Sequence, residues 1–231
     1  MKIIEDLIDV VKPIKIEDYI IGKHTILVES NTIGLASRLR DHQCVSDIDN
    51  MNLNELSKLA LSNNLGIASV GMAAINSFFE PNYKKIEFIN GYDYILNNGI
   101  RKKVGFVGHF SFIERLRKKM NDIVVFELKP RDQFDLDVKL MPEIIPTLDY
   151  LVITGTTLIN HTFEDIIKFK NSKTKIMMLG PSTTTSEILF DYGVDIIAGT
   201  LVENKKEIIQ NIKDGFGFKK QKGRKSYIFE K

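Results

Sequence analysis

The chain has 231 residues, of which 43% are hydrophobic and 27% are charged, and its formal net charge is +2. This balance is that of an ordinary globular protein with ample apolar material for a core, arranged as one large domain or two small ones. The single cysteine, Cys44, excludes an intrachain disulfide framework and a cysteine-cluster metal site, and it fits a reducing cytoplasm.

The distribution of charged and apolar residues excludes further classes of protein. No stretch approaches the roughly 20 apolar residues that span a bilayer, and Glu5, Asp6 and Asp9 interrupt the apolar N-terminus, so we expect no membrane span and no signal peptide. Residues 219–231 hold six Lys or Arg and one Glu, so the remaining chain is net acidic and does not predict a nucleic-acid-binding surface. The basic stretch at 219–225 either contacts an anionic partner or is a solvated, partly mobile end, and we favour the second interpretation.

The first part of the chain predicts a small α+β unit. Residues 1–12 have the apolar spacing of an amphipathic helix, and residues 14–36 read as a small antiparallel meander followed by a loop. Two helices are expected at 54–61, with Asn54 as its cap, and at 66–79.

The helix predicted at 66–79 has two unusual features. It begins with many small residues, which allow close packing of a helix on another backbone, and we favour this structural interpretation. Asn76 is polar in an otherwise apolar stretch, and a buried amide needs hydrogen-bonding partners. Those partners are either protein groups or a ligand, and the sequence leaves both alternatives open.

Residues 80–100 contain proline, paired asparagines and glycines, which indicate a connecting region, and we place a domain boundary near residue 97. The predicted organisation is therefore an α+β domain at 1–97, an α/β domain at 98–218 and a basic tail at 219–231. The α/β domain alternates short apolar runs with helical patterns, which predicts a parallel sheet. The predicted strands are residues 103–107, 123–126, 150–153, 175–179 and 194–198.

Each of these runs ends in small, polar or charged residues. If the strands are parallel, their carboxyl ends lie at one edge of the sheet, where open α/β folds bind ligands. The sequence therefore indicates where a ligand binds more clearly than which ligand it is.

The first strand runs into a glycine turn at Gly108-His109-Phe110. Ser111 and Glu114 have the spacing of a capping box, which predicts a helix starting near Phe112. A helix N-terminus facing a glycine turn suits an anion. The spacing is G-x-x-G and not the full G-x-G-x-x-G, so a tight turn without a ligand is the competing interpretation.

Polar groups follow the other strands. Glu127 lies about 20 residues after the first glycine turn, where an acid can bind a ribose. The alternatives are that it caps the strand end or pairs with Lys129 or Arg131. The turns Thr154-Gly155-Thr156-Thr157 and Gly180-Pro181-Ser182-Thr183 place hydroxyls and amides beside helix starts. They either hold a carboxylate or phosphate or act as caps.

His109 lies where a ligand would arrive. It could bind a metal, move a proton, donate a hydrogen bond or be purely structural. His161 follows the third strand on the same edge, whereas the pair His42 and Cys44 belongs to a predicted loop and is interpreted as incidental.

Several motifs in order make the chain similar to a known family. The motifs are residues 66–77, Val107-Gly108-His109-Phe110, Thr154-Gly155-Thr156-Thr157-Leu158-Ile159-Asn160 and Gly180-Pro181-Ser182-Thr183. The chain resembles the prokaryotic family labelled "putative heavy-metal chelation", which joins an enolase-N-terminal-like domain to a Rossmann-like domain. The resemblance implies a site in the cleft between the domains, lined by the three turns and closed by the helix that bears Asn76.

The leading hypothesis is binding of a small anionic ligand or heavy-metal chelate in this cleft, with a role in metal handling. The alternatives are an enzyme that uses a nucleotide or dinucleotide cofactor, and an interaction module with a vestigial site. The expected ligand-binding residues are Asn76, Gly108, His109, Phe110, Glu127, Thr154, Gly155, Thr156, Asn160, Gly180, Pro181, Ser182 and Thr183.

The plausible metal ligands are few. They are His109, Glu127 and His161, and His109 is the first candidate, although a soft metal held by the protein alone would want more Cys or His. A metal would therefore arrive already held by an organic chelator. A homodimer is compatible with the sequence, but no feature of it predicts one.

Overall fold

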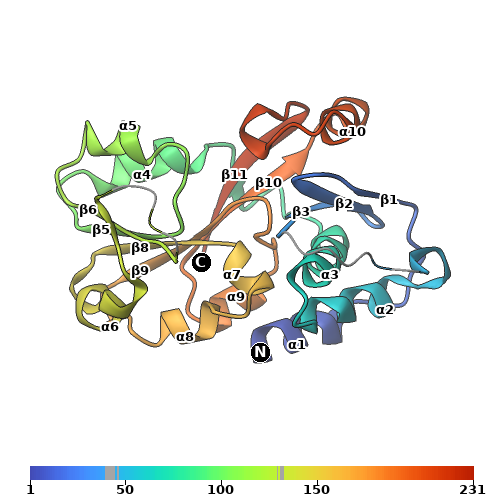
Figure 1. Cartoon of the computed structure of the whole chain (residues 1–231), viewed down its shortest axis with the longest axis horizontal. Coiled ribbons are helices and arrows are strands. Elements are labelled where there is room, and N and C mark those ends of the chain that lie inside the picture. Colours follow the sequence, from blue (N-terminus) through green and yellow to red (C-terminus); the bar gives the residue numbers. More distant parts are fainter. Residues whose placement is uncertain (40–44, 46, 129, 131–132) are drawn as a thin grey trace.

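The computed structural model describes residues 1–39, 45, 47–128, 130 and 133–231. It shows an eight-stranded mixed sheet and a three-stranded antiparallel sheet, each packed against helices (Figure 1). The α/β class predicted from the strand-helix alternation is confirmed. Within the described residues, no helix has both the length and the apolar character needed to cross a membrane.

The N-terminal part follows the predicted order. Its elements are α1 (Lys2–Val10), β1 (Asp18–Ile21), β2 (Thr25–Glu29), β3 (Ile33–Ser37), α2 (Leu53–Lys58) and α3 (Leu65–Phe78). The prediction of Asn54 as a cap is wrong, because Asn52 forms the capping box of α2 with Glu55. The Asn54 amide instead donates hydrogen bonds to the carbonyl groups of Ile8 and Val11 at the end of α1, at 3.2 and 2.8 Å.

The small residues of α3 allow close backbone packing, as interpreted. A Cβ atom on Gly71 would lie 2.0 Å from the backbone nitrogen of Ala60, and one on Gly34 of β3 would lie 2.2 Å from the carbonyl oxygen of Ala73. These approaches leave no room for a side chain, so the small residues bring β3 and the segment after α2 directly onto α3.

The large sheet has the strand order β4-β11-β10-β9-β8-β5-β6-β7. Its strands are β4 (Ile86–Glu87), β5 (Val104–Val107), β6 (Ile123–Phe126), β7 (Asp135–Leu136), β8 (Tyr150–Thr154), β9 (Lys175–Leu179), β10 (Ile196–Val202) and β11 (Arg224–Glu230). The six strands from β5 to β10 are parallel to one another, whereas β11 is antiparallel to both β10 and β4. Going along the chain, β5, β6 and β7 are added toward one edge of the sheet, and β8, β9 and β10 are added toward the other edge. The direction in which strands are added therefore reverses between β5 and β8.

Helices cover both faces of this sheet (Figure 1). On one face α4 (Gly91–Gly99) and α5 (Ile113–Arg117) pack against alternate strand residues such as Phe106. The other face, which includes Val107, packs against α6 (Met141–Ile144), α7 (Thr156–Ile159), α8 (Phe163–Ile167) and α9 (Ile188–Asp191).

Helix α10 (Lys205–Lys213) lies on the small sheet, where Ile208 and Ile212 contact Leu27 and Leu35. Short 3-10 turns complete the described structure. They are Ile48–Asn50, Leu59–Leu61, Val138–Leu140, Ile145–Thr147 and Phe218–Lys220.

The interpretation of residues 80–100 as a connection is wrong. β4 pairs with β11, and α4 buries Tyr92, Tyr94 and Ile95 against the large sheet. The predicted boundary near residue 97 falls inside α4, and the division into independent domains stays a prediction.

The sequence also predicts helix caps at Ser111, Thr162 and Thr184, each followed three residues later by an acid, and none of these side chains caps a helix. α5 begins after Phe112 and α9 after Glu187, so neither Ser111 nor Thr184 occupies the cap position. Thr162 does precede α8, but its hydroxyl donates to Asn160 rather than capping the helix. In each case a short helix is fixed by burial of its apolar face more than by a local cap.

The basic C-terminal end is not a solvated tail. β11 pairs antiparallel with β10 on one side and with β4 on the other, with Phe229 opposite Ile197. Its residues Tyr227, Ile228 and Phe229 are buried. The three buried side chains of the strand therefore outweigh the neighbouring cations in fixing this segment to the sheet.

Candidate functional site

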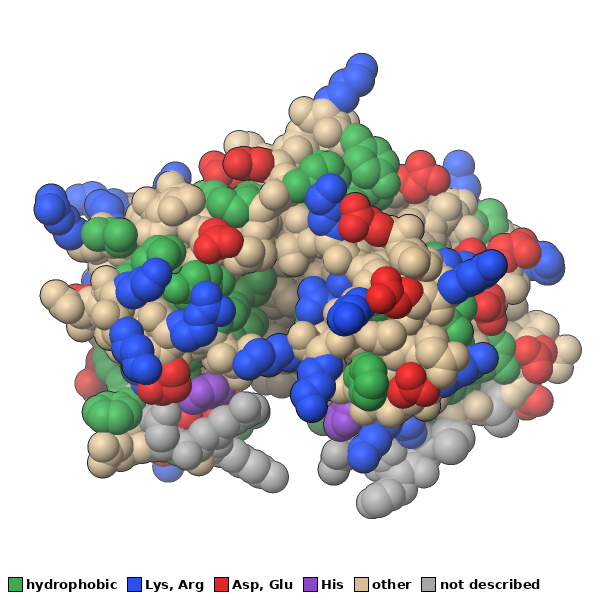
Figure 2. All heavy atoms as spheres, turned by 90° about the horizontal axis from the view of Figure 1, so that it is seen from above, with side chains coloured by type: hydrophobic (Ala, Val, Ile, Leu, Met, Phe, Trp, Pro, Cys, Tyr) green, Lys and Arg blue, Asp and Glu red, His purple; other side chains and the backbone are tan. Residues whose placement is uncertain are grey.

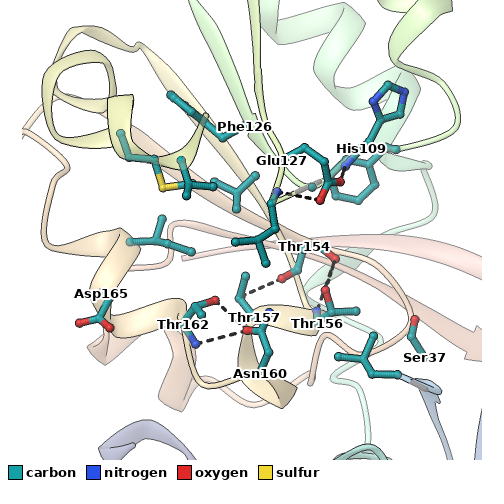
Figure 3. Close-up of a pocket in the computed structure, with 18 of the residues that line it drawn as sticks. Ser37, His109, Phe126, Glu127, Thr154, Thr156, Thr157, Asn160, Thr162 and Asp165 are labelled. Atoms are coloured by element: carbon teal, nitrogen blue, oxygen red, sulfur yellow. Dashed lines mark hydrogen bonds between the residues drawn. The ribbon is translucent and has the colours of Figure 1, made fainter. Parts of the chain in front are cut away.

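A cavity of about 620 Å³ lies over the carboxyl ends of β5, β6 and β8, where the strand order reverses (Figure 3). We call it the first cavity. Seven of the predicted ligand-binding residues line it: Gly108, His109, Phe110, Glu127, Thr154, Thr156 and Asn160. They meet because parallel strands that share an edge bring their carboxyl ends together.

The walls of the first cavity differ in polarity. Hydroxyl and amide groups of the segment after β8 lie along one side in Figure 3: Thr154, Thr156, Thr157, Asn160 and Thr162. Apolar side chains from β6, α6 and α8 lie on another, including Phe126, Met141 and Ile166. Glu127 and Asp165 are its acidic residues, and the described part of the lining contains no Lys or Arg.

Glu127 is fixed by two backbone groups. Its Oε2 accepts a hydrogen bond from the amide of His109 at 3.1 Å, and its Oε1 accepts one from the amide of Leu128 at 3.0 Å. The carboxylate thus joins the end of β6 to the glycine turn after β5, and its oxygens retain lone pairs for a ligand hydroxyl. The alternative partners Lys129 and Arg131 lie outside the described residues.

His109 makes a contact that the sequence did not predict. Its Nδ1 lies 3.2 Å from both carboxylate oxygens of Asp135 in β7, and Arg117 approaches the same carboxylate at 3.8 Å. The Asp135 side chain is 0% exposed and that of His109 is 12% exposed. Figure 3 shows the imidazole turned away from Thr154 and Thr156. Asp135 therefore orients the ring and leaves Nε2 as the nitrogen that could serve a ligand.

The hydroxyl and amide groups of the turn after β8 form hydrogen bonds within the protein. The hydroxyls of Thr154 and Thr156 lie 3.1 Å apart, and the hydroxyl of Thr157 donates to the carbonyl of Thr154 at 2.8 Å. The Gly155 amide donates to the carbonyl of Leu179. Gly155 does not line the first cavity, and a Cβ atom there would lie 2.7 Å from the Thr183 amide nitrogen. Hydroxyl groups, rather than free amides, face the cavity.

The turn after β9 is divided between two roles. Gly180 has φ +123°, a conformation that favours glycine, and it lines a second cavity together with Pro181. Ser182 is buried and accepts a hydrogen bond from the Ser37 amide at 2.9 Å. Ser182 and Thr183 lie outside the linings of both cavities.

Asn76 is held mainly by the protein. Its amide donates to the carbonyl of Leu35 at 2.8 Å and, more weakly, to that of Pro181 at 3.4 Å. Its Oδ1 and the Thr183 hydroxyl are buried without a partner beside a void of about 20 Å³. This polar void is large enough for one water molecule, but it is too small for a ligand.

The second cavity has a volume of about 440 Å³ and lies on the other side of β5 and β8. It shares Ser37, His109, Phe110 and Thr154 with the first, so the two cavities adjoin at the carboxyl ends of these strands. Its other walls come from α4, the glycine turn after β9 and the segment that leads into β11.

The candidate metal ligands are not assembled into a site. Among the described residues, no group of three or more His, Cys, Asp or Glu is placed to hold a metal ion. His161 binds the carbonyl of Ala60 through Nε2 at 2.8 Å and lines neither cavity. His42 and Cys44 lie outside the described residues. The donors among the described residues do not fit a bare heavy-metal ion held by the protein alone.

Sequence comparison relates the chain to proteins of unassigned function. Family models described as "Putative heavy-metal chelation" match residues 4–79 and 90–231. The uncharacterized protein MJ0500 of Methanocaldococcus jannaschii is 31% identical over 196 residues, which cover 77% of this chain and 74% of that protein.

Two crystal structures share the fold. They are proteins of unknown function from the DUF364 family of Desulfitobacterium hafniense and Pyrococcus horikoshii, with TM-scores of 0.88 and 0.82. Each is 21% identical, and each alignment covers 100% of this chain and 98% of the other. Matches over both parts of the sequence and over the whole fold show that the chain belongs to the family described as "Putative heavy-metal chelation".

Proposed function

We propose that the protein binds a small anionic ligand, or a metal ion already held by such a ligand, in the adjoining cavities. The observation that carries this proposal is the first cavity at the reversal of strand order, with hydroxyl groups on one side and apolar groups on the other. The family description supports metal handling. Because the described donors do not suit a bare soft metal, an organic chelator would supply most of its ligands.

Each polar group has a defined task in this proposal. The hydroxyls of Thr154 and Thr156 share one hydrogen bond, so one of them donates to a ligand oxygen, and Glu127 accepts from a ligand hydroxyl. Asp135 accepts from Nδ1–H of His109 and fixes the ring, and in this tautomer Nε2 accepts a hydrogen bond from the ligand. The single cysteine of the sequence supports a cytoplasmic setting for this function.

The first test is elemental analysis and denaturing mass spectrometry of protein purified without chelators or a histidine tag. Calorimetric titrations then compare Fe³⁺–citrate, citrate and Ni²⁺ alone. We expect Fe³⁺–citrate or citrate to bind and Ni²⁺ alone to bind weakly or not at all.

Substitutions in the first cavity locate that binding. Thr156→Val and Glu127→Gln are expected to weaken it about tenfold each, the usual effect of losing one polar contact to a charged or polar ligand. Thr147→Val and Glu143→Gln change exposed residues outside both cavities and are the matched controls. Equal affinities in all four variants would contradict the proposal.

A second candidate is an enzyme that uses a nucleotide or dinucleotide cofactor. Numbered along the chain, the six parallel strands have the order 3-2-1-4-5-6 of Rossmann-like sheets, and Glu127 follows the second of them. This candidate predicts binding of NAD, ATP or S-adenosylmethionine in the same titrations, with weaker binding in Glu127→Gln. The incomplete glycine motif at Gly108 favours the first proposal.

A further inference from the structure

The described residues that line the two adjoining cavities differ in the sign of their charge. The described lining of the first cavity contains Glu127 and Asp165 and no Lys or Arg. The lining of the second contains Lys219 and Arg224 and, within the same described residues, no Asp or Glu. A ligand that spans both cavities therefore meets hydroxyls and carboxylates at one end and cations at the other.

Arg224 is held in place but incompletely satisfied. Its guanidinium lies 4.0 Å from the Phe218 ring centroid and donates to the carbonyl of Phe218 at 3.0 Å, while Nε is buried without a hydrogen-bond partner. No carboxylate of the described chain pairs with it, and burial lowers the pKa of Arg224 below its ordinary value. An anion beside this guanidinium would offset its desolvation, because Arg presents several fixed donors.

Lys219 reaches the same cavity from the 3-10 turn Phe218–Lys220. Its ammonium group has no ion pair within the part of the chain that the structure describes, whereas Lys205 and Lys225 pair with Glu29 and Glu203. Figure 2 shows Lys and Arg side chains along the border of the hollow between the two halves of the molecule. Two neighbouring lysines are thus paired with carboxylates. Lys219 and Arg224, at the second cavity, have no ion pair among the described residues.

Among the described residues, no cationic side chain of the first cavity could pair with an anion. At the second cavity the Gly180 amide donates to the carbonyl of Ala198, so the side-chain cations remain as the donors for an anion. The second cavity adds aromatic walls to its cations, since Tyr92, Phe110 and Phe112 line it. The rings of Phe110 and Phe112 stack with centroids 5.5 Å apart. Flat apolar walls beside two cations suit a carboxylate or phosphate group attached to an apolar or unsaturated skeleton.

We propose that the second cavity is the anion subsite of the ligand, in which Lys219 and Arg224 hold a carboxylate or phosphate group. The remainder of the ligand passes Thr154 and His109, which both cavities share, and enters the first cavity. This inference rests on the proposed function and specifies its ligand: an elongated molecule with an anionic end and a hydroxyl-bearing end.

The experiment is an NMR titration of the full ¹⁵N-labelled chain at low ionic strength, with citrate and inorganic phosphate as separate probes. We expect the amide signals of Gly180, Thr200 and Ser226, which line the second cavity, to move with at least one probe. The stronger probe tells whether the subsite prefers carboxylate or phosphate.

Charge variants assign the shifts to the two cations. Lys219→Met is expected to weaken probe binding about fivefold and Arg224→Met about tenfold, because Arg224 is the better-ordered donor. Lys220→Met removes an exposed neighbouring cation that lines neither cavity and is the matched control, with less than a twofold effect. Arg224→Lys retains the charge and keeps the test valid if Arg224→Met does not fold.

The outcomes separate this inference from the proposed function. Probe binding that moves only first-cavity signals, with Lys219→Met equal to Lys220→Met, overturns the anion subsite and leaves the proposed function standing. Absence of shifts in both cavities with citrate, phosphate and a diamagnetic Ga³⁺–citrate complex overturns both. Second-cavity shifts that Lys219→Met and Arg224→Met weaken, but Lys220→Met does not, support the subsite.

Discussion

At the scale of single residues, Tyr227 shows how the large sheet constrains a polar group. The side chain is 1% exposed, and a Cβ atom on Gly199, its partner across β10 and β11, would lie 2.1 Å from the phenol oxygen. Glycine is thus required opposite the ring. Burial raises the pKa of Tyr227 well above its ordinary value, because the phenolate is poorly solvated there.

This shift predicts how stability depends on alkaline pH. Above pH 10 the unfolded chain releases the Tyr227 proton while the folded chain retains it, so the free energy of unfolding falls as pH rises. Tyr227→Phe should reduce that fall by about 1.4 kcal/mol per pH unit, the value for one proton. Urea unfolding between pH 8 and 11 measures it.

The matched control is Tyr83→Phe, which removes a phenol from a side chain that is 67% exposed. If Tyr227→Phe and the unmodified chain lose stability equally between pH 10 and 11, the buried phenol is not the group that titrates on unfolding.

At the scale of elements, β11 is the strand whose structure the amino-acid composition predicted least well. Its cations predicted a solvated tail, yet the strand lies between β10 and β4 and buries three successive residues. Its first residue is Arg224, and the segment just before it carries Lys219; both side chains line the second cavity. The strand therefore has a structural role and, in our proposal, positions the anion subsite.

Ile228→Ala tests the structural role of β11. Ile228 is 2% exposed and packs with Ala198 and Ile196 in the core between the large sheet and α4 and α5. We expect a loss of about 3 kcal/mol in the free energy of unfolding, which is typical of truncating a buried Ile. Urea unfolding measures the loss. Lys222→Ala, at an exposed position of the same segment, is the control, and a difference below 1 kcal/mol between the two would indicate a loosely attached strand.

At the scale of the whole molecule, one hydrophobic core joins the two halves. The same cluster contains Ile3 and Leu7 of α1 together with Ile153 of β8 and Phe163 of α8. The amide of Ile3 also donates to Glu164 at 2.9 Å, and the amide of Ser37 donates to Ser182. Both cavities include Ser37 from the first half, so the candidate site depends on this packing.

We therefore expect a single cooperative unfolding transition. Tyrosine fluorescence and far-ultraviolet circular dichroism should give the same urea midpoint, since neither half can expose its share of the core without the other. Two separated transitions would contradict this and would support independent domains at 1–97 and 98–218.

The sequence by itself determined where several strands form and at which edge of the large sheet the candidate site lies. β5, β6, β8 and β9 form where short apolar, β-rich runs end in glycine or polar residues. Gly108, Glu127 and Thr154 line the first cavity as expected, because each directly follows or ends a strand and parallel strands share one carboxyl edge. The Asn76 alternatives could not be resolved from the sequence, since Asn76 lies on α3 and its partner Leu35 lies in β3, 41 residues earlier in the chain.

Only the tertiary structure decided which distant groups meet. Asp135 lies in a two-residue strand within a charged segment, where no periodic pattern distinguishes it from Asp137, yet its carboxylate orients His109. Lys219 and Arg224 reach the second cavity because β11 returns antiparallel beside β10. Pairing of strands and packing of cavity walls depend on contacts between residues far apart in the chain, and local propensity does not encode them.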